Sequence, residues 1–218
     1  MKTSVFSGCL IDEKVNISNL KKFKNFKKGE SIFNEGENAQ AVFYIYDGKV
    51  KTLKKDKTGK EHIISFAKNG NLLGLHAIIN DTKFNATAIT LEDTSVCCIS
   101  KDDFLNLIKE DKNAFMRVMK LLCYDADTVE KRVLSIKHLS VTQRLVEGLL
   151  LLQQTFGKDK NNFINISLKD IELSGLTSAN KIVTRNLVKK MKEQQLIDVV
   201  ADKISILNTN KLKGILRN

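Results

Sequence analysis

The chain of 218 residues contains no proline and no tryptophan. Without proline, its turns must rest on glycine, asparagine and aspartate. Its four cysteines, Cys9, Cys97, Cys98 and Cys123, form no C-x-x-C pair and show no cysteine–histidine ligand spacing. We therefore expect no structural zinc site, no iron–sulfur cluster and no other metal, and we expect the thiols to stay reduced in the cytoplasm.

Other signals are also missing. No apolar stretch approaches the roughly 20 residues of a membrane span, and the first residues lack the apolar core of a signal peptide. The sequence shows no nucleophile–base pairing and no phosphate-cradling loop. We therefore predict a cytoplasmic protein that is not an enzyme, has no membrane partner and has no catalytic residue or cofactor.

Positive charge is plentiful. Lysine and arginine number 36 against 25 aspartates and glutamates, which gives a net charge of +11. Residues 1–110 contribute 17 − 14 = +3, residues 111–139 contribute 6 − 4 = +2, and residues 140–218 contribute 13 − 7 = +6. The excess is greatest in the last segment, which favours a polyanionic partner for that part of the chain.

That last segment contains a pattern of two short helices at residues 167–192, with a tight turn at Gly175 and Leu176. Thr177 or Ser178 is the expected cap of the second helix. The residues of this helix that we expect to be buried recur at three- and four-residue intervals and are Ile182, Val183, Leu187, Val188 and Met191.

The opposite face of the second helix is basic and carries amide groups. It consists of Asn180, Lys181, Thr184, Arg185, Lys189 and Lys190, and no acidic residue occurs from 173 to 192. Such a face suits the DNA major groove, where arginine or lysine binds guanine and asparagine binds adenine. The alternative is an ordinary solvated lysine face.

The N-terminal half has a different pattern. From Lys28 to Ile99, short strand-like runs alternate with turns every eight to twelve residues, including a strong hairpin signal at Asp47–Gly48. This predicts a small antiparallel barrel or roll. A helix capped by Ser100 follows it.

This half resembles the cyclic-nucleotide-binding roll of the Crp–Fnr transcription regulators. The similar segments are FKKGESIFNEGENAQAVFYIYDGKVK, TGKE, NGNLLGL and NATAITLEDTSVCCISKDDFLNLI, with six matching glycines at 29, 36, 48, 59, 70 and 74. The resemblance continues to about Leu207. It implies an α+β fold with an N-terminal antiparallel β-roll (1–110), a long dimerisation helix (111–139) and a C-terminal winged helix-turn-helix (140–218).

The effector pocket that the resemblance implies has an altered composition. Cyclic-nucleotide binders of the family use a Gly-Glu pair for the ribose and, about ten residues later, an arginine followed by small residues for the phosphate. The corresponding positions here are Gly74, Leu75, Phe84, Asn85, Ala86 and Thr87. A buried phosphate without a cation is costly, so we do not expect control by cyclic AMP. The roll is then a sensor for another, unknown effector or an unliganded scaffold; the alternative is a true cyclic-nucleotide response.

Residues 111–137 form a long helical pattern that no glycine interrupts. Apolar residues alternate at four and three positions, namely Phe115, Met119, Leu122, Ala126, Val129, Val133 and Ile136. A seam of about three heptads favours a two-fold coiled-coil dimer over a core helix of one chain.

Two strand-like runs, 195–200 and 203–207, follow the second helix and predict the wing. We expect base contacts from Arg185, Asn180 and Lys181, and phosphate contacts from Ser178, Thr184, Lys189 and Lys190. The prediction is a homodimeric, sequence-specific transcription regulator on a palindromic operator, with double-stranded DNA and RNA polymerase as partners. The alternative is a ligand-binding module that regulates a partner protein.

Overall fold

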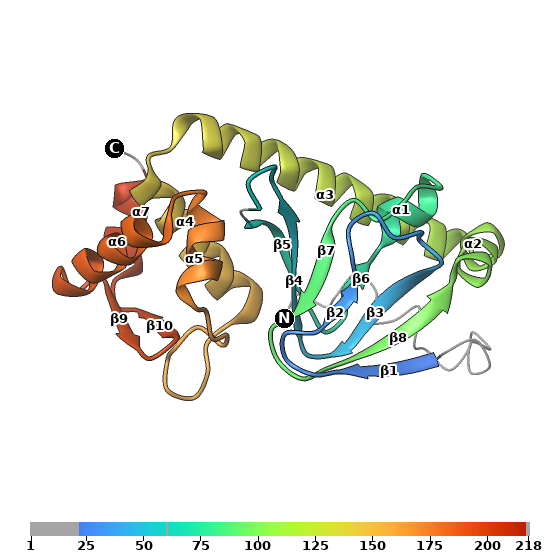
Figure 1. The fold of residues 1–218 in the computed structure, drawn as a ribbon, viewed down its shortest axis with the longest axis horizontal. Coiled ribbons are helices and arrows are strands. Elements are labelled where there is room, and N and C mark those ends of the chain that lie inside the picture. The colour runs from blue at the N-terminus through green and yellow to red at the C-terminus, as the bar shows by residue number, and fades with distance from the viewer. Residues whose placement is uncertain (1–21, 60, 217–218) are drawn as a thin grey trace. The chain divides into compact units, whose positions relative to one another are not determined.

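A computed structural model describes residues 22–59 and 61–216 of the chain (Figure 1). Cys9 lies outside these residues. The structure contains both helices and antiparallel sheets, so the predicted α+β class is confirmed. The described residues of 1–54 and 64–129 form one compact unit, and those of 55–63 and 130–216 form a second. None of the described helices is both long and apolar enough to span a membrane.

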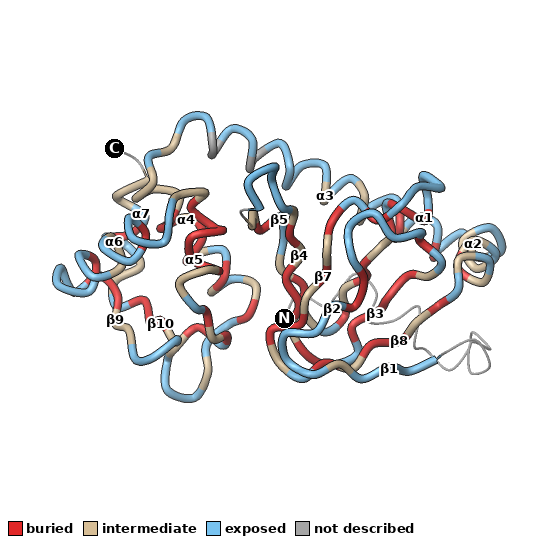
Figure 2. Tube along the Cα trace, viewed as in Figure 1, coloured by how far each residue is buried: buried red, intermediate tan, exposed pale blue. Residues whose placement is uncertain are grey.

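Two four-stranded sheets form the N-terminal roll. One sheet has the order β1-β8-β3-β6 and the other β2-β7-β4-β5. The strands are β1 (Lys22–Phe26), β2 (Ser31–Phe33), β3 (Ala41–Asp47), β4 (Lys49–Lys55), β5 (Glu61–Lys68), β6 (Leu72–Leu73), β7 (Thr87–Thr90) and β8 (Thr94–Ser100). The side chains of Val42, Ile45, Val50 and Val96 are fully buried in the hydrophobic core of the roll, and Figure 2 shows continuous buried stretches along its strands. The predicted antiparallel roll is confirmed.

Three helices accompany the roll: α1 (Leu75–Ile79), α2 (Lys101–Glu110) and α3 (Lys112–His138). Ser100 caps α2, as predicted, because its Oγ accepts a hydrogen bond from the backbone N–H of Asp103 at 3.2 Å. Helix α3 covers most of the predicted dimerisation segment and buries Ala114 and Val118. The proposed limits of the three segments, at 110 and 139, stay a prediction.

The second unit contains a helical core and a hairpin. Its elements are α4 (Val141–Phe156), α5 (Asp170–Thr177), α6 (Lys181–Glu193), β9 (Ile197–Val200), β10 (Lys203–Ile206) and α7 (Thr209–Ile215). Ser140 caps α4 in a complete capping box with Gln143. Leu145, Leu149 and Leu152 of α4 are fully buried and form the centre of this unit. Strands β9 and β10 pair antiparallel with Ile204 opposite Val199, which matches the predicted wing.

The hairpin between β3 and β4 depends on a glycine. Gly48 has φ of +112°, and a Cβ atom there would lie 2.3 Å from Thr94 Oγ1 and 2.8 Å from Thr94 Cα. Any side chain at 48 would therefore meet both a backbone penalty and a direct clash. Gly36 has a similar φ of +86°, but nothing lies within 4 Å of its ideal Cβ position.

We expect Gly48→Ala to lower the free energy of unfolding by about 2–5 kcal/mol, as the sum of left-handed backbone strain and a clash. Gly36→Ala is the matched control and should lose only the backbone part, about 1–2 kcal/mol. Urea denaturation of both variants measures the difference. Equal losses would show that contact with Thr94 is unimportant.

Candidate nucleic-acid interface

Helix α5 ends, and helix α6 begins, differently from the sequence prediction. Thr177 is the last residue of α5, and Ser178 follows it in the left-handed conformation with φ of 55°. The cap of α6 is Asn180, whose Oδ1 accepts a hydrogen bond from the backbone N–H of Val183 at 2.8 Å. The prediction that Thr177 or Ser178 caps α6 is therefore wrong, because α5 continues further than expected.

Two buried threonines join the two helices. The Oγ1 atoms of Thr177 and Thr184 lie 2.9 Å apart, and the Thr184 hydroxyl also donates to the Asn180 carbonyl at 3.1 Å. Thr184 is only 1% exposed. Its predicted place on the exposed face is therefore wrong, and it cannot contact DNA without leaving the core. Arg144 of α4 braces the same junction by donating from Nε to the Thr177 carbonyl at 2.8 Å.

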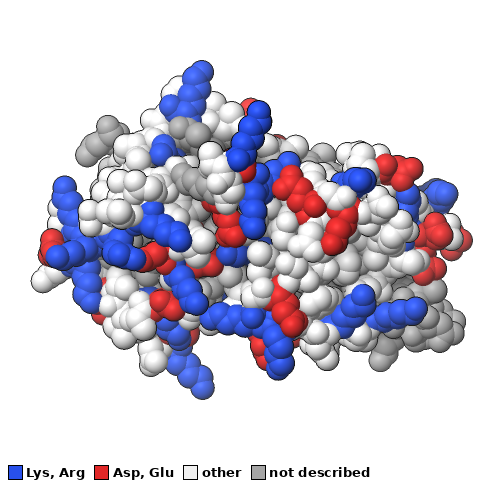
Figure 3. Space-filling model, viewed as in Figure 1, with Lys and Arg blue, Asp and Glu red and all other residues white. Residues whose placement is uncertain are grey.

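The outward face of α6 is basic. Lys181, Arg185, Lys189 and Lys190 are all exposed, while Leu187 and Val188 are half-buried and Met191 is buried. In Figure 3, lysine and arginine gather over the region where Figure 1 places α6. The cationic face that the sequence predicts is thus present, apart from Thr184.

Two apolar residues of α6 contradict the predicted burial. Ile182 is 68% exposed and Val183 is 41% exposed. At 100° per residue, Ile182 lies about 180° from Met191 around the helix, so the two side chains point to opposite faces. The sequence pattern therefore assigned to one buried face residues that lie on different sides of α6.

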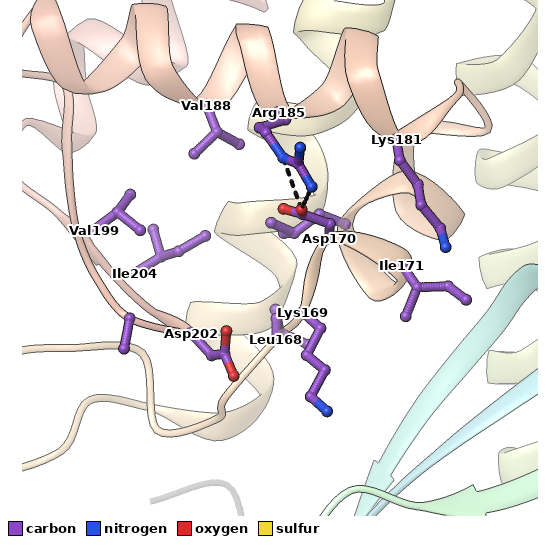
Figure 4. A pocket seen from close by; sticks show the side chains of 12 residues that line it. Leu168, Lys169, Asp170, Ile171, Lys181, Arg185, Val188, Val199, Asp202 and Ile204 are labelled. Atoms are coloured by element: carbon purple, nitrogen blue, oxygen red, sulfur yellow. Dashed lines mark hydrogen bonds and ion pairs between the residues drawn. The ribbon is translucent and has the colours of Figure 1, made fainter.

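Arg185 forms an ion pair with Asp170 at the start of α5 (Figure 4). Its Nε donates to Asp170 Oδ2 at 2.8 Å, and Nη2 donates to the same oxygen. A guanidinium has five N–H donors, so 5 − 2 = 3 remain for another partner. The side chain is 65% exposed, which leaves those donors accessible to an anion. Asp170 therefore acts as a positioning residue for Arg185.

Helix α6 is also tied to the wing. Lys192 Nζ lies 3.0 Å from Asp198 Oδ1 and donates to the Val199 carbonyl at 2.7 Å. The hydrogen bond from Lys192 lowers the pKa of the Asp198 carboxyl, with the backbone N–H of Val199 as the second cause. Lys192 is thus engaged with the wing, while the lysines one turn earlier remain on the open face.

A hollow of about 470 Å³ lies between α5, α6 and the wing. The basic side chains that line it are Lys169, Lys181 and Arg185, and the wing contributes Val199, Ala201 and Ile204 (Figure 4). Sequence reasoning missed Lys169. The sequence did offer one signal for Lys169 as a phosphate-binding residue. It comes immediately before Asp170, at the start of α5, and helix N-termini attract phosphate groups.

The predicted effector pocket is occupied by the chain itself. The Phe84 ring stacks on Phe33 with centroids 4.0 Å apart, and Phe43 lies 6.3 Å from it. A Cβ atom on Gly74 would come within 2.9 Å of the Phe84 ring. The structure thus brings Gly74 and Phe84 together and places an aromatic ring where the sequence resemblance implies an anion-binding group.

The remaining pocket residues supply no cation. Leu75 and Ala86 are buried, and Asn85 is exposed. The Thr87 hydroxyl accepts a hydrogen bond from the backbone N–H of Glu35 at 3.0 Å. Lys83, the basic residue of this segment, is exposed. This surrounding is apolar and closely packed, and it does not suit a phosphate.

Helix α3 exposes a long apolar surface. Of the predicted seam, Phe115, Met119, Val129 and Val133 are 46%, 39%, 57% and 58% exposed, Ala126 is exposed, and Leu122 is half-buried against the roll. The side chain of Ile136 lies outside what the structure describes. Sequence reasoning missed Met116, Tyr124 and Leu134, which are also more than half exposed. A strict heptad template is narrower than the surface that the helix presents.

Comparison with known proteins shows which proteins this chain is similar to. A family described as the cyclic nucleotide-binding domain matches residues 23–111. The cAMP-activated global transcriptional regulator CRP of Salmonella typhimurium is 23% identical over 181 residues, which cover 82% of this chain and 86% of that protein. The predicted resemblance to the Crp–Fnr transcription regulators is confirmed by these matches.

Other relatives and solved structures show the same resemblance. The global nitrogen regulator of Nostoc is 21% identical, with 84% of each chain covered. The structure of FixK2 from Bradyrhizobium japonicum has the same fold, with a TM-score of 0.79, 17% identity, and coverage of 89% of this chain and 96% of that one. The predicted resemblance to transcription regulators of this kind and the α+β fold are confirmed.

Proposed function

We propose that this protein is a sequence-specific DNA-binding regulator that acts as a homodimer on a palindromic operator. The outward face of α6 carries the proposal. That face carries four exposed basic residues on a helix that is joined to α5 by hydrogen bonds, and Lys169 adds one further cation at the adjacent hollow. An exposed, positively charged helix beside a wing is the arrangement that enters a major groove.

The proposed roles follow from exposure and hydrogen bonding. Lys181 and Arg185 contact bases, since they lie in the first half of α6 and keep free donors. Lys189, Lys190 and Ser178 contact phosphates, and Lys169 joins them. Asn180 also binds a phosphate through its amide N–H groups, because the cap already uses its carbonyl oxygen.

The proposed dimer forms through the exposed apolar surface of α3. Monomers rarely expose large apolar side chains along a whole helix. Such side chains are typical of the seam of a coiled coil. Pairing two α3 helices about a two-fold axis presents two α6 helices, which fit half-sites about 34 Å apart on one side of DNA. RNA polymerase is the proposed further partner and follows from the transcriptional role alone.

We also propose that this protein does not respond to cyclic AMP. The Phe84–Phe33 stack against Gly74 supports this, because a nucleotide would have to displace a buried aromatic cluster and then leave its phosphate without a cation. The effector, if the roll binds one, differs in chemistry from a cyclic nucleotide.

Selection of the purified full chain against a random DNA library, with and without cyclic AMP, tests operator recognition. We expect the same palindrome to be enriched in both arms. Enrichment only with cyclic AMP would contradict the interpretation of Leu75 and Phe84. Absence of enrichment in both arms would contradict sequence-specific binding.

The salt dependence of binding tests the phosphate contacts. We expect Lys189→Ala and Lys190→Ala each to weaken binding to all sequences and to make the slope of log K against log salt shallower by about 1.8, because each removes two contacts per dimer at about 0.9 each. Lys109→Ala on α2 removes the same exposed charge away from α6 and should leave the slope unchanged. Slopes that match the control would exclude these lysines from the interface.

Sedimentation of charge variants tests the dimer. We expect Val129→Glu to dissociate it, since a carboxylate would lie in an apolar seam. Thr128→Glu adds the same charge to the same turn of α3, off the seam, and should remain dimeric. Circular dichroism confirms that α3 stays helical in both. A dimeric Val129→Glu protein would rule out this surface.

A further inference from the structure

We propose that two uncharged residues on the exposed face of α6, Ile182 and Asn186, read A·T base pairs in each half-site. Ile182 contacts the C5 methyl group of thymine, and Asn186 forms paired hydrogen bonds with adenine. This inference rests on the proposed DNA binding and adds which bases the helix selects. It replaces Asn180 as the adenine-binding residue.

Ile182 stands at the outermost position of α6. Its exposure of 68% is the highest among the large hydrophobic residues of the described chain, although lysines and an arginine surround it. It faces directly away from Met191 and lies in the first turn, the part of a recognition helix that reaches base edges. An apolar side chain there gains from contact with an apolar group in the groove, and the thymine methyl is that group.

Asn186 lies one turn after Ile182 on the same face. Four residues advance a helix by about 400°, so the two side chains point within about 40° of each other. Asn186 is exposed, and the described residues offer its side chain no hydrogen-bond partner. Both its amide oxygen and its N–H₂ group are thus available. Adenine requires this combination, since N6 donates and N7 accepts.

Asn180 lacks this freedom. Its carbonyl oxygen accepts the backbone N–H of Val183 at 2.8 Å, so a paired contact with adenine would break the cap of α6. No acidic side chain is present from Lys181 to Lys192, so this face lacks the carboxylate that typically accepts from cytosine N4. The chemistry of both residues therefore agrees on A·T pairs.

Replacement of thymine by deoxyuracil tests the contact with Ile182. Deoxyuracil pairs like thymine but lacks the C5 methyl group. With the palindrome selected by the wild-type protein, we measure affinity after single replacement of each thymine. We expect one symmetric position to bind about fourfold more weakly per half-site, the loss of one buried methyl group (about 0.8 kcal/mol).

Two variants assign the effect. Ile182→Ala should bind the thymine and deoxyuracil operators equally. Ile64→Ala removes an isoleucine of β5 that is 49% exposed, and it should retain the wild-type difference. Asn186→Ala should lose the preference for adenine at one position by about 5- to 150-fold and keep the thymine effect.

The outcomes separate this inference from the proposed function. Wild-type binding that is insensitive to deoxyuracil at every position would overturn the role of Ile182 while DNA binding stands. Discrimination that persists in Ile182→Ala would do the same. An unchanged base preference in Asn186→Ala would overturn its role. If the wild-type protein selects no DNA at all, the proposed function fails, and this inference fails with it.

Discussion

The hydrogen bond between the hydroxyls of Thr177 and Thr184 fixes which residues of α6 face outward. Both side chains are buried, and their 2.9 Å contact joins the last residue of α5 to the first turn of α6. A rotation of α6 by one residue, about 100°, would turn Thr184 out of this contact and exchange the exposed set. The identity of the presented side chains therefore depends on a buried polar pair, whose partners would be costly to separate.

The same constraint explains why sequence reasoning identified the region but misassigned its residues. Thr177, Ser178 and Asn180 are all acceptable caps, so local preference alone cannot choose among them. The choice is made by how far α5 extends before its end is buried under Arg144. Placing the cap at Asn180 moves Ile182 outward and Thr184 inward. Features set by local sequence, such as the Ser100 cap and the wing hairpin, were predicted because no distant contact decides them.

Contacts between distant residues are the part that the sequence could not provide. The Arg185–Asp170 pair spans 15 residues and two helices, and the Phe33–Phe84 stack joins residues from separate strands and loops. The family resemblance pointed to Gly74 and Phe84 as pocket residues, which stays a prediction, and only the geometry shows that Phe84 packs on Phe33 against Gly74. For helix α3, the sequence predicted part of the exposed apolar surface and missed the rest. Its seam was predicted from periodicity, but Met116, Tyr124 and Leu134 follow from the surface that the roll leaves uncovered.

Affinity and specificity are divided between different side chains of one helix. Lysines bind phosphates wherever they occur, so the net charge of +6 over residues 140–218 favours binding to DNA of any sequence. Added salt weakens this part of the proposed binding. Sequence selection must come from groups that touch base edges, and the outward face of α6 presents the uncharged Ile182 and Asn186 beside its lysines. Because neither residue is charged, their contribution is insensitive to salt. In the proposed complex, binding to random DNA should therefore fall as ionic strength rises while the contacts to individual bases persist, so Ile182 and Asn186 add selectivity to the base contacts proposed for Lys181 and Arg185.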